Sequence, residues 1–162
     1  MQASLILQLL ILLVVANGIA VVAKRVLGDA FAYPLDGGAR FLDGRPLFGP
    51  AKTVRGIALA LVATPMVSAL MGLGFEVGVV VAAGAMAGDL FSSFVKRRLG
   101  LPSSSMAIGL DQVPESLVPL VACRLLLPLT VLEIVAGVVI FFVGELVLSR
   151  ILYKLKLRDR PF

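Results

Sequence analysis

An uncharged apolar run over residues 5–23 constrains this chain more than any other feature. A helix needs about 20 apolar residues to cross the hydrocarbon core of a bilayer, and this run is of that length. No basic residue precedes it, whereas a cleaved signal peptide begins with positive charge and has a shorter apolar core. We therefore expect the run to be a retained first membrane span.

The composition of the whole chain is that of a protein that folds within a bilayer. Its 162 residues are 59% hydrophobic and 15% charged, whereas about a quarter of a soluble domain is charged. We predict an all-α integral membrane protein, with a single catalytic domain over 1–162, about five transmembrane helices and two functional cytoplasmic loops. The expected spans are 5–23, 57–74, 77–97, 112–127 and 130–148, the loops 24–56 and 98–111, and the tail 149–162. The long apolar stretch 113–148 is expected to turn at Pro128 and Thr130.

The distribution of basic residues predicts how the chain is oriented. Nearly all of the 15 lysines and arginines fall in or beside the two loops or in the tail, and only Arg124 lies elsewhere. Because cytoplasmic segments retain such residues, we expect a cell-membrane protein with its N-terminus outside and its active face in the cytoplasm. The net charge of +5 then suits phosphorylated substrates and anionic lipid, with no nucleic acid as partner. The chain has no histidine and one cysteine, which excludes histidine catalysis, histidine-bound zinc and an internal disulfide.

The first predicted loop combines the residue types of phosphate-binding loops. Asp43 and Gly44 lie within it, and Lys52, Thr53 and Arg55 stand where the second span begins. A helix N-terminus would add its free N–H groups and positive dipole to these cations. The alternative is an ordinary positively charged loop with turn glycines.

The third span carries a sharper signal, GDLFSSFVKRR at residues 88–98. At helical spacing Asp89, Ser93 and Lys96 share a face, and Ser92 and Arg97 lie at its margins. An acid within a span is costly and is by default a functional candidate. The alternative is that Asp89 only pairs with a nearby Lys or Arg. Glycines and alanines of this span, at positions 84, 85, 87 and 88, are expected to let neighbouring helices approach closely.

A second acidic segment, GLDQVPE at residues 109–115, opens the fourth span. Asp111 and Glu115 would share a helical face, although Asp at a helix start is often only a cap. Asp89 and Asp111, from different helices and beside a basic loop, are the kind of oxygen ligands that a cation bridging phosphates needs. We therefore predict that these two acids bind a divalent metal ion.

Three blocks resemble the archaeal CDP-archaeol synthase family, relatives of the bacterial phosphatidate cytidylyltransferases. They are FLDGRPLFGPAKTVRG at 41–56, GDLFSSFVKRRLG at 88–100 and LDQVPESL at 110–117. The bacterial relatives share a Ser-x-x-x-Lys-Arg signature, met here by Ser92, Lys96 and Arg97. They also share an Asp-Arg-x-x-Asp element, to which Asp111 corresponds; its second acid is replaced by Pro114, and Glu115 is the neighbouring candidate substitute.

The resemblance implies transfer of the cytidylyl group of CTP to an ether-linked isoprenoid lipid phosphate, 2,3-bis-O-geranylgeranyl-sn-glycerol 1-phosphate, with release of pyrophosphate. The implied catalytic residues are Asp89, Asp111, Lys96 and Arg97, and Asp89 and Asp111 are the implied ligands of Mg²⁺. The implied CTP-binding residues are Asp43, Gly44, Lys52, Thr53, Arg55, Ser92, Ser93 and Gln112. The nucleophile is already an anion, so a chain without histidine can support the reaction.

Two other functional classes fit less well. The segment DGGAR at 36–40 is one residue short of the Asp-Gly-x-x-Ala-Arg motif of CDP-alcohol phosphotransferases, and Thr53 and Ile57 occupy positions where that motif needs acids. A small membrane channel or transporter, with Asp89 in its pathway, is the alternative function. Against it, polar residues do not continue to the predicted outer face.

Overall fold

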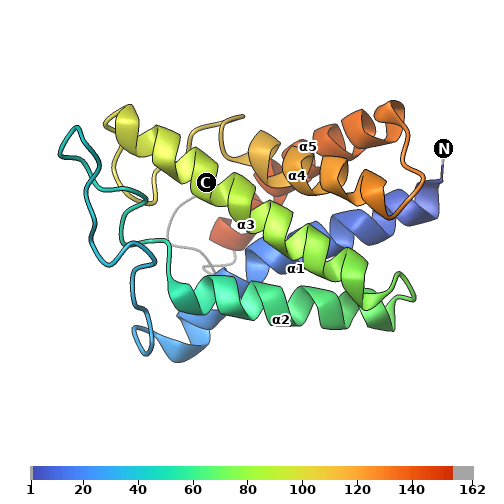
Figure 1. Cartoon of the computed structure of the whole chain (residues 1–162), viewed down its shortest axis with the longest axis horizontal. Helices are drawn as coiled ribbons and strands as arrows, with labels where there is room; N and C mark the ends of the chain where they lie inside the picture. Colours follow the sequence, from blue (N-terminus) through green and yellow to red (C-terminus); the bar gives the residue numbers. More distant parts are fainter. Residues whose placement is uncertain (1, 155–162) are drawn as a thin grey trace.

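The computed structural model describes residues 2–154, which contain five α-helices joined by loops (Figure 1). They are α1 (Ala3–Leu27), α2 (Val54–Leu70), α3 (Phe75–Arg98), α4 (Gln112–Ala122) and α5 (Val131–Lys154), and a 3₁₀ turn, η1 (Cys123–Leu125), follows α4. One buried hydrophobic cluster contains residues of all five helices. The predicted all-helical architecture is therefore confirmed.

Three helices have the length and apolarity needed to cross a membrane. These candidate spans are Ala3–Leu27, Phe75–Arg98 and Val131–Ile151, and the 17-residue α2 is apolar but shorter. Large apolar side chains point away from the bundle, with Leu7 59% exposed, Val62 58% and Val139 55%. Exposing such an apolar surface to water costs free energy, whereas the hydrocarbon of a bilayer solvates it without that cost. The chain is therefore an integral membrane protein. The count of five spans stays a prediction.

The expected fourth span, 112–127, is not one continuous helix. The 11 residues of α4 rise about 16 Å, roughly half the thickness of the hydrocarbon core. The chain then turns before α5, where Thr130 and Glu133 form a reciprocal capping box: the Glu133 N–H donates to Thr130 Oγ1 at 3.2 Å, and the Thr130 N–H donates to Glu133 Oε2 at 3.0 Å. The turn predicted at Pro128 and Thr130 is confirmed.

The last helix continues past the expected end of the fifth span. Residues 149–154, predicted to begin the tail, form the final turns of α5. Apolar residues such as Ile151 extend the pattern of the helix, so no signal ends it at 148. The remainder of the predicted tail, 155–162, lies outside the described residues.

Helix α3 lies between α2 and α4, and glycines let α4 approach its backbone (Figure 1). A Cβ atom at Gly84 would lie 2.7 Å from Pro119 Cα, and one at Gly88 would lie 2.2 Å from the carbonyl oxygen of Pro114. The close approach predicted at Gly84 and Gly88 is confirmed. Ala87, by contrast, is exposed, because helical spacing turns it away from α4.

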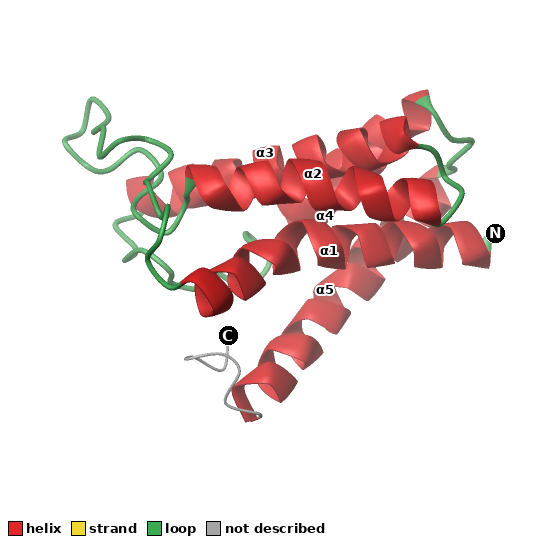
Figure 2. Ribbon diagram, turned by 90° about the horizontal axis from the view of Figure 1, so that it is seen from below, coloured by secondary structure: helices red, strands yellow, loops and turns green. Residues whose placement is uncertain are grey.

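Both long loops lie at one end of the bundle, which we call the loop end (Figures 1 and 2). The first loop, 28–53, joins α1 to α2, and the second loop, 99–111, joins α3 to α4. The candidate residues of the first loop, of the end of α3 and of the start of α4 therefore meet at the loop end. Helix α5 diverges from α1 in the same direction (Figure 2).

Candidate functional site

The first loop is folded around the carboxylate of Asp36. Its Oδ1 accepts the N–H of Gly38 at 3.0 Å, and its Oδ2 accepts the N–H groups of Phe48 at 2.9 Å and Gly49 at 3.0 Å. Burial raises the pKa of this carboxyl, but the backbone donors outweigh burial and hold the pKa below its usual range. Sequence reasoning assigned Asp36 no role in this protein; its Asp-Gly step was the signal for a turn.

Arg98 attaches the first loop to the end of α3. Its Nη1 lies 3.1 Å from Asp43 Oδ1, and its Nη2 donates to the carbonyl oxygen of Pro46 at 2.5 Å. Its guanidinium also lies 4.8 Å from the ring centroids of Phe41 and Phe94, within cation–π range. Asp43 thus serves to position the loop on α3. Sequence reasoning did not single out Arg98, because helical spacing puts it opposite the Asp89 face.

Two glycines with positive φ values shape the first loop, and one of them lies against the second loop. Gly44 and Gly49 have φ values of 75° and 91°, which L-residues rarely adopt. The turn at Gly44 is further held by Asp43 Oδ1, which accepts the N–H of Arg45 at 3.0 Å. A Cβ atom at Gly49 would lie 3.3 Å from Ser103 Oγ, so the two loops are in contact there.

An ion pair between the first loop and α3 forms the centre of the site. Lys52 Nζ lies 2.5 Å from both carboxylate oxygens of Asp89, and about a fifth of each side chain is exposed. Glu115 of α4 is buried beside them, within hydrogen-bonding reach of Asp89, and Glu145 of α5 is close enough to act on Glu115 electrostatically. Asp89 therefore does pair with a basic residue, as the alternative expects, and the pair stands beside a second acid. Its predicted functional role stays a prediction.

A second ion pair holds the second loop against α3. Lys96 Nζ lies 2.6 Å from Asp111 Oδ1 and donates to the carbonyl oxygen of Ser105 at 2.9 Å. Asp111 Oδ2 accepts the N–H of Ala107 at 2.8 Å, and its side chain makes no capping bond to α4. The interpretation of Asp111 as a helix cap is therefore wrong. Its carboxylate instead ties the second loop to Lys96.

The two predicted metal ligands belong to different ion pairs, and their joint binding of a metal ion stays a prediction. Asp89 pairs with Lys52 and lies beside Glu115. Asp111, the last residue of the second loop, pairs with Lys96, two turns beyond Asp89 on α3. Among residues 2–154, no three acidic or cysteine side chains converge on one point as a ready cation cage. Mg²⁺ needs no such cage, because it takes one or two carboxylates and completes its shell with water and substrate phosphate. The oxygen donors of Asp89 and Glu115 fit that chemistry.

Two residues predicted to bind CTP have structural contacts at the ends of the first loop. Thr53 is the N-cap of α2, and its Oγ1 accepts the N–H of Gly56 at 3.2 Å. Arg55 Nη1 donates to the carbonyl oxygens of Gly28, at 3.1 Å, and Ala30. These bonds attach the side chain of Arg55 to the start of the first loop.

The remaining predicted residues are buried at the loop end. They are Ser92, Ser93, Arg97 and Gln112. Ser92 Oγ donates to the carbonyl oxygen of Gly88 at 2.9 Å, and Gln112 Oε1 accepts the N–H of Gly109 at 2.8 Å. Arg97 Nη2 donates to a carbonyl oxygen of the second loop, that of Pro102, at 2.9 Å. Their contacts stabilise the helix and the loop, and their part in CTP binding stays a prediction.

Comparison with known proteins gives consistent matches. A family model described as CarS-like, CDP-archaeol synthase, matches residues 71–162. The CDP-archaeol synthase of Pyrobaculum aerophilum is 35% identical over 153 residues, which cover 91% of this chain and 92% of the relative. That of Sulfurisphaera tokodaii is 34% identical over 154 residues, covering 91% and 89%. A solved structure, described as an intramembrane enzyme for archaeal membrane lipid biosynthesis, has a TM-score of 0.67 at 32% identity, covering 86% of this chain and 91% of that one.

Proposed function

This chain belongs to the CDP-archaeol synthase family, as its three sequence blocks predict, and we propose that its loop end carries the family's reaction. In that reaction the cytidylyl group of CTP is joined to the phosphate of 2,3-bis-O-geranylgeranyl-sn-glycerol 1-phosphate, giving CDP-archaeol and pyrophosphate. The observation that supports this site is the Lys52–Asp89 pair beside Glu115, where a polar loop meets membrane helices. Family membership leaves the channel or transporter alternative without support.

The reaction needs positioning and charge balance more than proton transfer. A phosphate oxygen of the lipid attacks the α-phosphorus of CTP, the new P–O bond forms, and the bond to the bridging oxygen of pyrophosphate breaks. The nucleophile is anionic, so no base has to remove a proton. Lys52, Lys96 and Arg97 are the cations that would bind the triphosphate and the leaving pyrophosphate, since all three lie at the loop end.

We propose that Mg²⁺ is held by Asp89 and Glu115. A bound Mg²⁺ would neutralise charge on the phosphates. Both oxygens of Asp89 now contact the ammonium of Lys52, which marks the carboxylate as a cation-binding group. Lys52 would turn from Asp89 to a phosphate oxygen of CTP. The role predicted for Asp111 as a ligand is kept as a competing assignment, tested alongside Glu115 below.

The loop end would face the cytoplasm, where CTP is available. Lys and Arg are concentrated there, while Arg124 lies in η1 at the opposite end. By the positive-inside rule the N-terminus of α1 is then outside. The lipid phosphate would enter from the bilayer with its tails between the helices, and CTP would enter from the water through the loops.

The test is transfer of radiolabel from CTP into the lipid phase by purified protein, measured across a range of Mg²⁺ concentrations. Asp89→Asn and Glu115→Gln should each lose at least about 100-fold in rate or require far more Mg²⁺, as expected when charge stabilisation is removed. Asp111→Asn should need no more Mg²⁺ than the wild type. Glu76→Gln, at an exposed acid on the opposite end of α3, is the matched control.

Two outcomes would overturn parts of this proposal. If Asp111→Asn rather than Glu115→Gln raises the Mg²⁺ requirement, the metal is held by the residue pair that the sequence predicts. If folded wild-type protein transfers no label from CTP to any lipid phosphate, the assigned reaction itself is wrong.

A further inference from the structure

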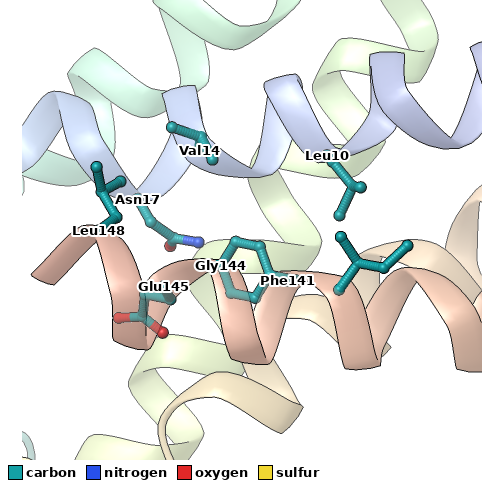
Figure 3. A pocket seen from close by; sticks show the side chains of 8 residues that line it. Leu10, Val14, Asn17, Phe141, Gly144, Glu145 and Leu148 are labelled. Carbon is teal, nitrogen blue, oxygen red and sulfur yellow. The ribbon is translucent and has the colours of Figure 1, made fainter.

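A cavity of about 250 Å³ lies between α1 and α5, on the side of the bundle away from α2 (Figure 3). Its wall is mainly apolar, from Leu10 and Val14 of α1 and from Phe141 and Leu148 of α5. Helix α5 packs chiefly on α4 and contacts α1 only sparsely, and the two helices diverge toward the loop end (Figure 2). The cavity is therefore open to the surrounding hydrocarbon.

One polar group in this apolar wall lacks a partner. Asn17 Nδ2 is buried and has no hydrogen bond to any of the described residues, and Figure 3 shows the amide directed from α1 toward α5. An unsatisfied buried donor costs about 1–3 kcal/mol, so such a group is rarely retained without a use. The Asn17 N–H donor would be satisfied by an oxygen atom that accepts but does not donate hydrogen bonds and that belongs to an otherwise apolar molecule.

The Asn17 and Leu148 end of the cavity is the end nearer the loop end of the bundle, where the candidate reaction site lies. Glu145 lines the cavity near Asn17 (Figure 3) and is close enough to Glu115 to interact with it electrostatically. A molecule lying along the cavity therefore has its end near Asn17 closest to the Lys52–Asp89 pair. Leu10 and Asn17 are two helical turns apart, so the cavity follows the helices for about 10 Å.

We propose that this cavity binds one isoprenoid chain of the lipid phosphate substrate, and that Asn17 donates a hydrogen bond to the ether oxygen joining that chain to glycerol. The proposal rests on the proposed function, because it places the phosphate of the same lipid beside Lys52. The volume supports a chain segment as occupant, since pockets that enclose whole ligands are typically about 300–1,000 Å³. The acceptor-only chemistry of an ether matches the unpaired donor.

Gly144 offers a way to fill the cavity without distorting the backbone. It lines the cavity, and a Cβ atom built on it meets nothing within 4 Å. Gly144→Leu should raise the KM for the long-chain lipid phosphate at least about tenfold, the cost of excluding a few methylenes. The KM for CTP, and turnover of an analogue whose chains are truncated to a few carbons, should be unchanged. Gly18→Leu is the matched control, since Gly18 is also helical, has open space and does not line the cavity.

A second measurement reports binding without turnover. A lipid phosphate with a photoreactive group in one chain should crosslink to residues 10–17 and 140–148, and Gly144→Leu should abolish this labelling. Asn17→Leu should raise the KM for the ether lipid phosphate and leave the KM for CTP unchanged.

Three results would overturn the proposal. Equal KM values for Gly144→Leu and Gly18→Leu would exclude the cavity as a substrate site. An unchanged KM for the ether lipid phosphate in Asn17→Leu would exclude the hydrogen bond to the ether oxygen. If a lipid with the same chains but no phosphate reduces the crosslinking as strongly as the lipid phosphate does, the cavity is a site for bulk bilayer lipid and not for the substrate. If instead the wild type transfers nothing from CTP, the proposed function fails while the crosslinking result still decides the cavity.

Discussion

Replacement of Gly88 by alanine tests the contact on which the site depends. The added methyl carbon would lie 2.2 Å from the carbonyl oxygen of Pro114, 2.5 Å from its carbonyl carbon and 2.8 Å from the backbone nitrogen of Glu115. Carbon atoms in ordinary contact are about 3.5–4.0 Å apart, so α3 and α4 must separate by about 1 Å or more. Because the obstacle is backbone, no side-chain rotation relieves it.

The expected loss of stability follows from two opposing terms. Overpacking of this kind costs about 1–3 kcal/mol. The change from glycine to alanine within a helix returns about 0.5–1 kcal/mol. The net loss is about 0–2.5 kcal/mol, and its central value of about 1 kcal/mol corresponds to a Tm lower by about 2–4 °C for a chain of this size.

Two matched variants separate the effect on stability from the effect on activity. Gly78→Ala places a methyl group 2.4 Å from the Cα atom of Pro65, far from the loop end, and should lower Tm by a similar amount with little loss of activity. Gly18→Ala meets nothing within 4 Å and should leave Tm unchanged or slightly higher. Gly88→Ala should also lose cytidylyl transfer well below its Tm, because it moves Glu115 away from Asp89.

The assays are thermal unfolding in detergent and label transfer from CTP at a temperature at which all the variants are folded. If Gly88→Ala matches Gly18→Ala in both Tm and activity, the backbones of α3 and α4 are not in close contact at Gly88. If it lowers Tm but keeps full activity, the site does not depend on the spacing between Asp89 and Glu115.

Three further perturbations test the contacts at the loop end. Lys52→Met should lower Tm and activity, because it leaves Asp89 without its partner. The double variant with Asp89→Asn should regain Tm but not activity, which corresponds to a coupling energy between the two residues of roughly 0.5–3 kcal/mol. Additive effects of the two substitutions on Tm would contradict the ion pair. Arg98→Leu removes the attachment of the first loop to α3. The backbone amides of the first loop should then exchange hydrogen faster, and more CTP should be needed for half-maximal activity. Unchanged amide exchange in the first loop would refute this role of Arg98. The lowered pKa of Asp36 means that its carboxylate stabilises the loop fully above about pH 4 and progressively less as pH falls through the lower folded-state pKa. The excess Tm of the wild type over Asp36→Asn should therefore be constant near neutral pH and shrink in acid, and an excess that grows in acid would contradict the assignment.

Membrane spans were predictable from sequence because span length and apolarity are local properties. The runs that predict α1, α3 and α5 are long and almost free of charge, so no distant contact is needed to identify them. The half-length of α4 was not predictable, because hydropathy is the same whether residues 123–127 continue the helix or leave it. The structure settles this with η1 and with the capping box that starts α5.

Candidate residues were identifiable by type, but their partners were not. An acid within a span indicated Asp89 from sequence alone. That its partners are Lys52, 37 positions away, and Glu115 depends on how the loop folds back and how two helices align. Arg98 was missed for the same reason. Nothing in the sequence distinguishes a basic residue that attaches a loop to a helix end from one that only interacts with lipid head groups.

The amino-acid sequence by itself determined that this protein is a helical membrane protein, that its polar chemistry lies in a few short segments, and which family it resembles. The hydropathy and the charge of a segment are sums over its own residues, so both can be calculated from the sequence without knowing the fold. Tertiary structure alone decided that Asp89 pairs with Lys52 beside Glu115, that Asp111 pairs with Lys96, and that a cavity lies between α1 and α5. These features depend on the register between helices, which backbone contacts such as Gly88 against Pro114 set to within about one turn.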